Sequence, residues 1–229
     1  MWSIVLSARD KDRTGFRQAL EKLCRMYWYP VYAYVRRRGL SVEDAEDLTQ
    51  EFFSRLVEKQ FLQAVSEDRG RFRGFLLMAL KRFLANEWNR EHTKKRGGDV
   101  IVFSLDFVGA EGRYQTEPAD DITPEKLFQR EWGLNILERT LFRLREEHAA
   151  LGDGFDFDRL KMYLTGDAPR GLCGRLAAER GVTEGAARVA VHRLRRRFGD
   201  LLRAEIRETV DSEQEIDDEV RFLLEAVGL

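Results

Sequence analysis

Hydrophobic side chains recur at helical spacing along most of the 229-residue chain. The first such stretch lies between Thr14 and Tyr27, where apolar residues follow at spacings of four, three and four: Phe16, Leu20, Leu23 and Tyr27. This spacing predicts a helix with one buried face. Pro30 is expected to end or kink the helix, and the same rhythm continues to Gly39.

Two further helices are expected before residue 100. Ser41 precedes acidic residues at the start of the first, where a cap and the helix dipole favour them. Its apolar positions form one stripe: Ala45, Leu48, Phe52 and Leu56. The second begins near Phe72, is apolar around most of its circumference and is therefore expected to be buried. It runs into a polar, basic stretch that ends at Gly97-Gly98.

Residues 99–125 differ from what precedes them. Phe103, Leu105 and Phe107 alternate with polar or small residues, which predicts an extended segment. Pro118 and Pro124 bracket a loop-like run. Helical periodicity returns from Leu127 to Leu144 and again from Phe157 to Gly166. We therefore predict an all-α fold with two small helical domains joined by a linker.

The most specific local pattern lies between Gly171 and Phe198. Leu176 and Ala177 fit a short helix, Gly181-Val182 fits a tight turn, and Thr183 can cap the helix that follows. The apolar face of this second helix is formed by Ala187, Ala190 and Leu194. The pattern is typical of a helix-turn-helix, whose second helix enters the major groove of DNA. A solvated, arginine-rich helix in a bundle is the alternative.

Charge is segregated along the chain although the net charge is only -1. Residues 1–100 carry 20 basic and 14 acidic side chains, and residues 170–207 carry 10 basic and four acidic ones. Residues 208–229, by contrast, carry one basic and eight acidic side chains. Two basic blocks separated by an acidic middle indicate two surfaces that each meet a polyanion.

The acidic run Asp44-Ala45-Glu46-Asp47-Leu48-Thr49-Gln50-Glu51 resembles region 2.2 of bacterial RNA polymerase sigma factors. Downstream, Arg71-Phe72-Arg73-Gly74-Phe75-Leu76 is similar to the start of region 2.3 in the small two-domain sigma factors of the extracytoplasmic-function (ECF) group. The helix-turn-helix pattern lies where region 4.2 is expected. The resemblance covers most of residues 15–203.

For the first domain, the resemblance implies contact with core RNA polymerase and with the opened -10 strand. The residues expected to contact the clamp helices of the polymerase β′ subunit are Asp47, Gln50 and Glu51. Exposed carboxylates and an amide on a rigid helix also suit a basic partner surface. The residues expected to bind the -10 strand are Lys81, Arg82, Asn86, Trp88, Asn89 and Arg90. Trp88 is expected to stack on a base of that strand.

For the second domain, the resemblance implies that region 4.2 reads the -35 element. Its base-facing positions match Arg188, Val189, His192 and Arg193. Thr183, which caps the helix, also belongs to the predicted DNA-binding set. Phosphate contacts fall to Arg195, Arg196 and Arg197. The implied partners are core polymerase (β′ clamp helices and β flap) and promoter DNA, with an anti-sigma factor as a further candidate.

The domains predicted on this basis are a region 2-like domain at residues 1–98, an extended acidic linker at 99–125, and a region 4-like domain at 126–207. An acidic helical extension follows at 208–229. Its amphipathic pattern allows two interpretations. The helix packs on the second domain, or its acidic side chains cover the basic helix-turn-helix face and inhibit DNA binding.

Other classes of protein fit the sequence less well. A stand-alone helix-turn-helix regulator is the alternative function, but it leaves the first domain without a task. No metal-ligand spacing, phosphate-binding loop or catalytic triad order is visible, so we expect neither an enzyme nor a bound cofactor or metal. The longest apolar run, Phe75 to Leu80, is too short to cross a membrane. With only two cysteines far apart, a cytoplasmic protein is expected.

Overall fold

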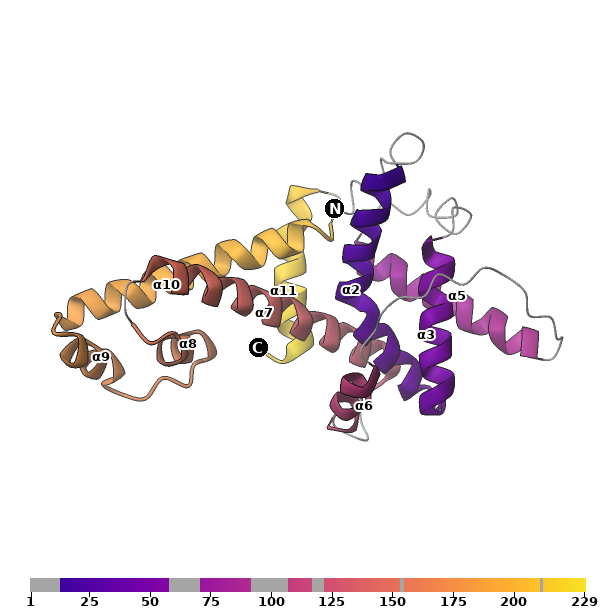
Figure 1. Ribbon diagram of the computed structural model, residues 1–229, viewed down its shortest axis with the longest axis horizontal. Helices are drawn as coiled ribbons and strands as arrows, with labels where there is room; N and C mark the ends of the chain where they lie inside the picture. The colour runs from indigo at the N-terminus through magenta and orange to yellow at the C-terminus, as the bar shows by residue number, and fades with distance from the viewer. Residues whose placement is uncertain (1–12, 58–70, 92–106, 117–121, 153–154, 211) are drawn as a thin grey trace. The chain divides into compact units, whose positions relative to one another are not determined.

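The computed structural model describes residues 13–57, 71–91, 107–116, 122–152, 155–210 and 212–229. The regular elements in these ranges are all helical (Figure 1), which confirms the predicted all-α class. They are α2 (Arg13–Arg37), α3 (Val42–Val57), α5 (Phe72–Glu91), α6 (Phe107–Gln115), α7 (Pro124–Leu151), α8 (Phe157–Thr165), α9 (Leu172–Arg180), α10 (Glu184–Arg207), η2 (Glu213–Glu215) and α11 (Ile216–Val227). Across these ranges, none of the helices combines the length and apolar character needed to cross a membrane.

The chain forms two compact units. The first contains residues 1–135 together with 206–229, and the second contains residues 136–205. These bounds differ from the sequence-based domains in two places. The beginning of α7 and the acidic C-terminal extension both belong to the first unit.

Helix α2 continues through Pro30, where the sequence predicted an end or a kink. A proline inside a helix leaves the carbonyl four residues earlier without its N–H partner. Here that carbonyl belongs to Met26, and the side-chain amide of Asn135 on α7 donates to it at 3.0 Å. A tertiary hydrogen bond thus replaces the missing helical one. Gly39, at a φ of 87°, then lets the chain turn after α2.

Aromatic side chains fill much of the core of the first unit. Tyr27 of α2 meets Phe72 of α5 edge-on, with ring centroids 4.9 Å apart, and stacks on Phe128 of α7 at 6.4 Å. The ring centroids of Phe52 on α3 and Phe83 on α5 lie 5.5 Å apart, with the two rings tilted by 55°. Burial of each such ring contributes about 1.5–3 kcal/mol. The burial expected for the helix that begins near Phe72 is confirmed at Phe72 and Phe83, while Phe75 is only half-buried.

Residues 107–115 form helix α6, so the prediction of an extended linker is wrong for this part of residues 99–125. Tertiary ion pairs explain the difference. Glu111 accepts hydrogen bonds from Arg36 at two positions, both 2.9 Å, and from the Tyr32 hydroxyl at 2.6 Å. The Arg36 bonds, helped by Tyr32, lower the pKa of Glu111 to about 2, so the carboxylate is charged at neutral pH. The alternating Phe103 and Leu105 lie outside the described residues.

The C-terminal extension packs in the first unit through a buried carboxylate on α11. Glu219 is fully buried and pairs with Arg73 through two bonds, 2.5 and 3.1 Å, and with Arg71 at 3.1 Å. The Arg73 guanidinium also lies 3.6 Å from the centroid of the Phe222 ring. Helix α11 approaches α7 so closely that a Cβ at Gly133 would lie 2.8 Å from Val227.

The inhibitory role of the acidic side chains of the extension stays a prediction. The extension packs against α5 and the start of α7, so only part of its contact is with residues 126–207, the second domain predicted from the sequence. The physical reason is the buried glutamate, whose charge is matched by Arg71 and Arg73 at the start of α5.

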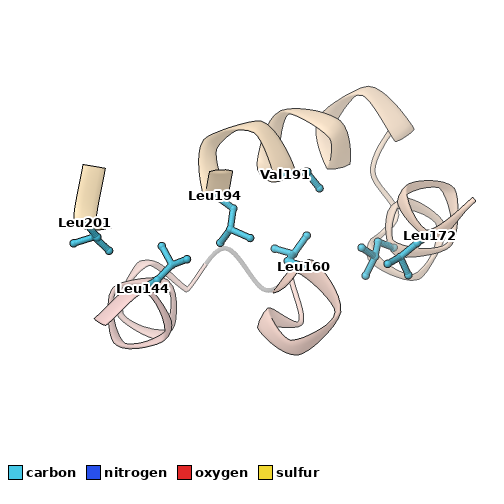
Figure 2. Packing of buried hydrophobic residues seen from close by; sticks show 7 residues of the cluster. Leu144, Leu160, Leu172, Val191, Leu194 and Leu201 are labelled. Carbon is cyan, nitrogen blue, oxygen red and sulfur yellow. The ribbon is translucent and has the colours of Figure 1, made fainter. Parts of the chain in front are cut away.

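The second unit has its own apolar core, shown in Figure 2. Helices α7, α8, α9 and α10 each contribute to it. The buried residues are Leu144, Leu160, Leu172, Leu176, Val191, Leu194 and Leu201. Because α8 and α9 are short, this shared core is what holds them against α10.

Glu219→Gln is expected to lower the free energy of unfolding of the first unit by about 3 kcal/mol, because it breaks a buried ion pair and leaves the half-buried Arg73 without its counter-ion. Chemical denaturation followed by tryptophan fluorescence measures this. The signal reports on the first unit, since Trp28, Trp88 and Trp132, the tryptophans of the described residues, all lie in it. Glu225→Gln on the exposed side of α11 is the matched control, with an expected change within about 0.5 kcal/mol. Equal effects of the two variants would show that the Glu219 pair does not hold the extension in place.

Candidate functional site

Helix α3 presents the predicted polymerase-binding residues. Ser41 caps it, since its hydroxyl accepts from the Asp44 backbone N–H at 3.1 Å, as the sequence predicted. The helix buries a stripe made of Ala45, Thr49, Phe52, Phe53 and Leu56. Leu48, expected in that stripe, is only half-buried.

That packing turns the predicted residues outward. Asp47 is exposed, and Gln50 and Glu51 are half-buried beside it. Glu51 also pairs with Arg55, one turn later on the same helix. The exposed side of α3 is acidic, because Glu43 and Asp44 lie there too. Such a surface complements a basic partner.

Helix α5 carries the residues predicted to meet the -10 strand. Lys81, Arg82, Asn86 and Trp88 are exposed. Trp88 is 67% exposed, and an exposed aromatic ring is of the kind on which a base can stack. Asn89 and Arg90 continue the helix, but their side chains lie outside the described residues.

One of these cations is already held within the first unit. The Lys81 ammonium lies 2.8 Å from the Glu125 carboxylate of α7, and this bond raises the pKa of Lys81. Glu125 in turn accepts from the Tyr34 hydroxyl at 3.4 Å. No local pattern indicates this pairing, because residues 81 and 125 are distant along the chain. Lys81 therefore fixes α5 against α7 as well as lying on its exposed side.

In the second unit, α9 and α10 are joined by a tight turn at Gly181. This glycine has a φ of 63°, and its N–H donates to Ala178 O at 3.2 Å. The next N–H, of Val182, donates to Ala177 O at 3.0 Å. These two bonds are those of a Schellman motif, which satisfies the last carbonyls of a helix. Thr183 then caps α10 by accepting from Ala186 N at 3.2 Å, as predicted.

The exposed side of α10 lies opposite its buried stripe. Ala187, Val191 and Leu194 face the core, while Ala190 is only half-buried. The predicted base-facing residues are all exposed: Arg188, Val189, His192 and Arg193. Val189 is 49% exposed, an apolar side chain on an otherwise basic surface. Arg188 also bonds Glu184 at 2.6 Å on the same face.

The three consecutive arginines after this face differ in their surroundings. Arg195 donates twice to the Tyr163 carbonyl of α8, at 3.1 and 2.9 Å. Arg197 grips the Glu147 carboxylate of α7 with two bonds, 2.6 and 2.7 Å, which lowers the pKa of Glu147. Arg196 is exposed on the side opposite the core. Each residue turns a helix by about 100°, so residues 195 and 197 flank the outward position of 196.

A buried glutamate anchors the same helix farther along. Glu205 is 2% exposed and pairs with Arg139 at 3.0 Å and Arg143 at 2.6 Å, both on α7. Burial would raise the pKa of Glu205, but hydrogen bonds from Arg143 and Arg139 outweigh it and hold the pKa below its ordinary value. Sequence reasoning missed this anchor. The i, i+4 spacing of Arg139 and Arg143 was the available signal.

Arg55 is a further residue that sequence reasoning missed. It lies on α3 one turn after Glu51, and its guanidinium also reaches Glu87 of α5 at 2.7 Å. The signal for the first contact was the i, i+4 spacing from Glu51. The sequence contains no signal for the contact of Arg55 with Glu87, since that contact depends on how α3 packs against α5.

The comparisons with known proteins support one family. A family model described as ECF sigma factor matches residues 11–147, which is more than half of the chain. No curated protein and no solved structure matches. The matched range contains α2, α3 and α5, with the acidic run at residues 44–51, and ends within α7. The chain therefore belongs to the ECF sigma factor family, a non-enzymatic family of transcription initiation factors that bind core RNA polymerase and promoter DNA.

Proposed function

We propose that this sigma factor directs core polymerase by reading the -35 element with α10 and the opened -10 strand with the exposed side of α5. The observation that carries the proposal is the outward face of α10. It presents Val189, His192, Arg193 and Arg196 on a helix that follows α9 through a tight turn. A helix presented in this way suits the major groove, where side chains can reach base edges.

In this proposal the acidic side of α3 docks on the clamp helices of the β′ subunit through Asp47, Gln50 and Glu51. The second unit meets the β flap. Support for the first contact comes from the exposure of Asp47 and from the position of the acidic run inside the family match. An anti-sigma partner stays a prediction from the resemblance alone.

The same proposal divides the arginines of α10. Arg196 contacts a DNA phosphate, because it is exposed opposite the core. Arg195 and Arg197 chiefly position α10, because their guanidinium groups bond Tyr163 and Glu147. This revises the sequence-based expectation, which gave phosphate contacts to all three.

Co-purification with core polymerase tests the docking surface. The Asp47→Ala/Gln50→Ala variant is expected to lose polymerase binding, because both side chains are on the proposed contact face. Glu225→Ala/Gln214→Ala removes one acid and one amide from exposed positions of the extension and is the matched control. If the wild type fails to bind polymerase but still binds duplex DNA, the chain acts as a stand-alone helix-turn-helix regulator.

Salt dependence separates phosphate contacts from positioning contacts. Arg196→Ala is expected to weaken binding to all duplexes alike and to lower the slope of log affinity against log salt by about 0.9, the value for one phosphate contact. Arg197→Ala removes the same charge but is expected to change this slope far less and to destabilise the second unit. Fluorescence anisotropy with a labelled random-sequence duplex measures both. A slope change as large for Arg197→Ala as for Arg196→Ala contradicts the division.

Base preference is tested at Arg188. Its side chain is 72% exposed beside Glu184, so it can leave that partner and reach a base edge. Arg188→Ala is expected to relax the preference at one base pair of the -35 element, at a cost of about 1–3 kcal/mol. Selection from a random duplex library followed by sequencing measures the preference. Arg196→Ala, the control, should select the same sequences as the wild type.

A further inference from the structure

Arg55 lies between two carboxylates of the first unit that belong to different proposed surfaces. On α3 it pairs with Glu51, and on α5 it pairs with Glu87 at 2.7 Å. The guanidinium is also placed 5.1 Å from the centroid of the Phe83 ring. Its side chain is only 26% exposed, so it is held from several sides. Arg55 thus links α3 to α5 with its charged group.

The two carboxylates have different neighbours. Glu51 belongs to the acidic side of α3, next to Gln50, which we propose as the polymerase contact. Glu87 lies on α5 between Asn86 and Trp88, at the end of the helix that we propose meets the -10 strand. Glu87 is the more enclosed of the two, with 17% of its side chain exposed against 42% for Glu51.

The position of Glu87 raises a physical difficulty for DNA binding. A carboxylate on the same helical turn as a DNA-binding tryptophan weakens the attraction of that turn for the phosphates of an approaching strand unless a cation offsets it. The structure places the Arg55 guanidinium at that carboxylate. The planar fork of arginine can bond two carboxylates at once, whereas the ammonium of lysine is a single point charge.

We propose that Arg55 is a positioning residue that serves both surfaces of the first unit. It holds Glu51 in the orientation that core polymerase meets, and it compensates Glu87 so that the -10 strand can approach Asn86 and Trp88. This inference rests on the proposed function, because it assigns the polymerase to α3 and the strand to α5. It adds a residue that contacts neither partner.

Arg55→Ala is expected to weaken two affinities of the full-length protein by at least about tenfold each, the size of one lost charge-assisted hydrogen bond. The first is its affinity for core polymerase. The second is the affinity of the holoenzyme, at saturating polymerase, for a labelled pool of random single-stranded oligonucleotides. Arg55→Lys is expected to keep strand binding near the wild-type value and to recover polymerase binding only in part.

A second substitution separates positioning from simple loss of packing. In Arg55→Ala/Glu87→Gln the carboxylate that Arg55 offsets is removed as well, so strand affinity is expected to return to within about threefold of the wild type, less than one ordinary hydrogen bond. Polymerase affinity is expected to stay low, because Glu51 still lacks its partner. A merely structural role for Arg55 predicts no such selective recovery, and its absence would overturn the inference.

Two controls distinguish the inference from the function on which it rests. Arg36→Ala breaks another ion pair of the first unit, that of Arg36 with Glu111. It should leave the affinities for core polymerase and for single-stranded DNA unchanged. If Asp47→Ala/Gln50→Ala abolishes polymerase binding while Arg55→Ala changes neither affinity, the role of Arg55 is wrong and the proposed function stands. If the Asp47 and Gln50 substitutions also have no effect, the proposed docking surface itself is wrong.

Discussion

Burial of a carboxylate is stable only when a cation neutralises it, and this requirement recurs at the main helix contacts of both units. In the described part of the chain, Glu131, Glu205 and Glu219 are buried, and each of them pairs with two arginines. The pairs join α6 to α7, α7 to α10, and α5 to α11. Since an unpaired buried charge is costly, each pair determines which helices must meet. Apolar packing alone is less selective about its partners.

The same pairing limits which cations are available to a polyanion. A count of basic residues along the sequence treats Lys81, Arg195 and Arg197 like their exposed neighbours. In the folded chain, Lys81 is bonded to Glu125, Arg195 to the Tyr163 carbonyl and Arg197 to Glu147. The basic blocks therefore do two things. Some of their charges hold the helices in place, and others, such as Arg196, face outward.

Much of the proposed site could be predicted because it depends on local rules. The cap at Ser41, the turn at Gly181 and the cap at Thr183 follow from residue types at fixed offsets, and all three form as expected. Helical periodicity likewise places Asp47 and His192 on the outside. Two of the contacts that escaped prediction have no local signal. The contact of Arg55 with Glu87 and that of Asn135 with Met26 join residues far apart in sequence.

By itself, the sequence determined the helical class, the helix-turn-helix pattern and the ECF resemblance, because periodicity, capping and motif order depend on residues that are close together in the chain. Only the tertiary structure decided that residues 107–115 are helical, that α2 continues through Pro30, and that the acidic extension belongs to the first unit. Each of these outcomes depends on a distant partner: Arg36 for Glu111, Asn135 for Met26, and Arg73 for Glu219. The sequence reveals which residues carry a charge or a carbonyl that needs a partner. Which group becomes that partner depends on the tertiary structure, because the two are distant along the chain.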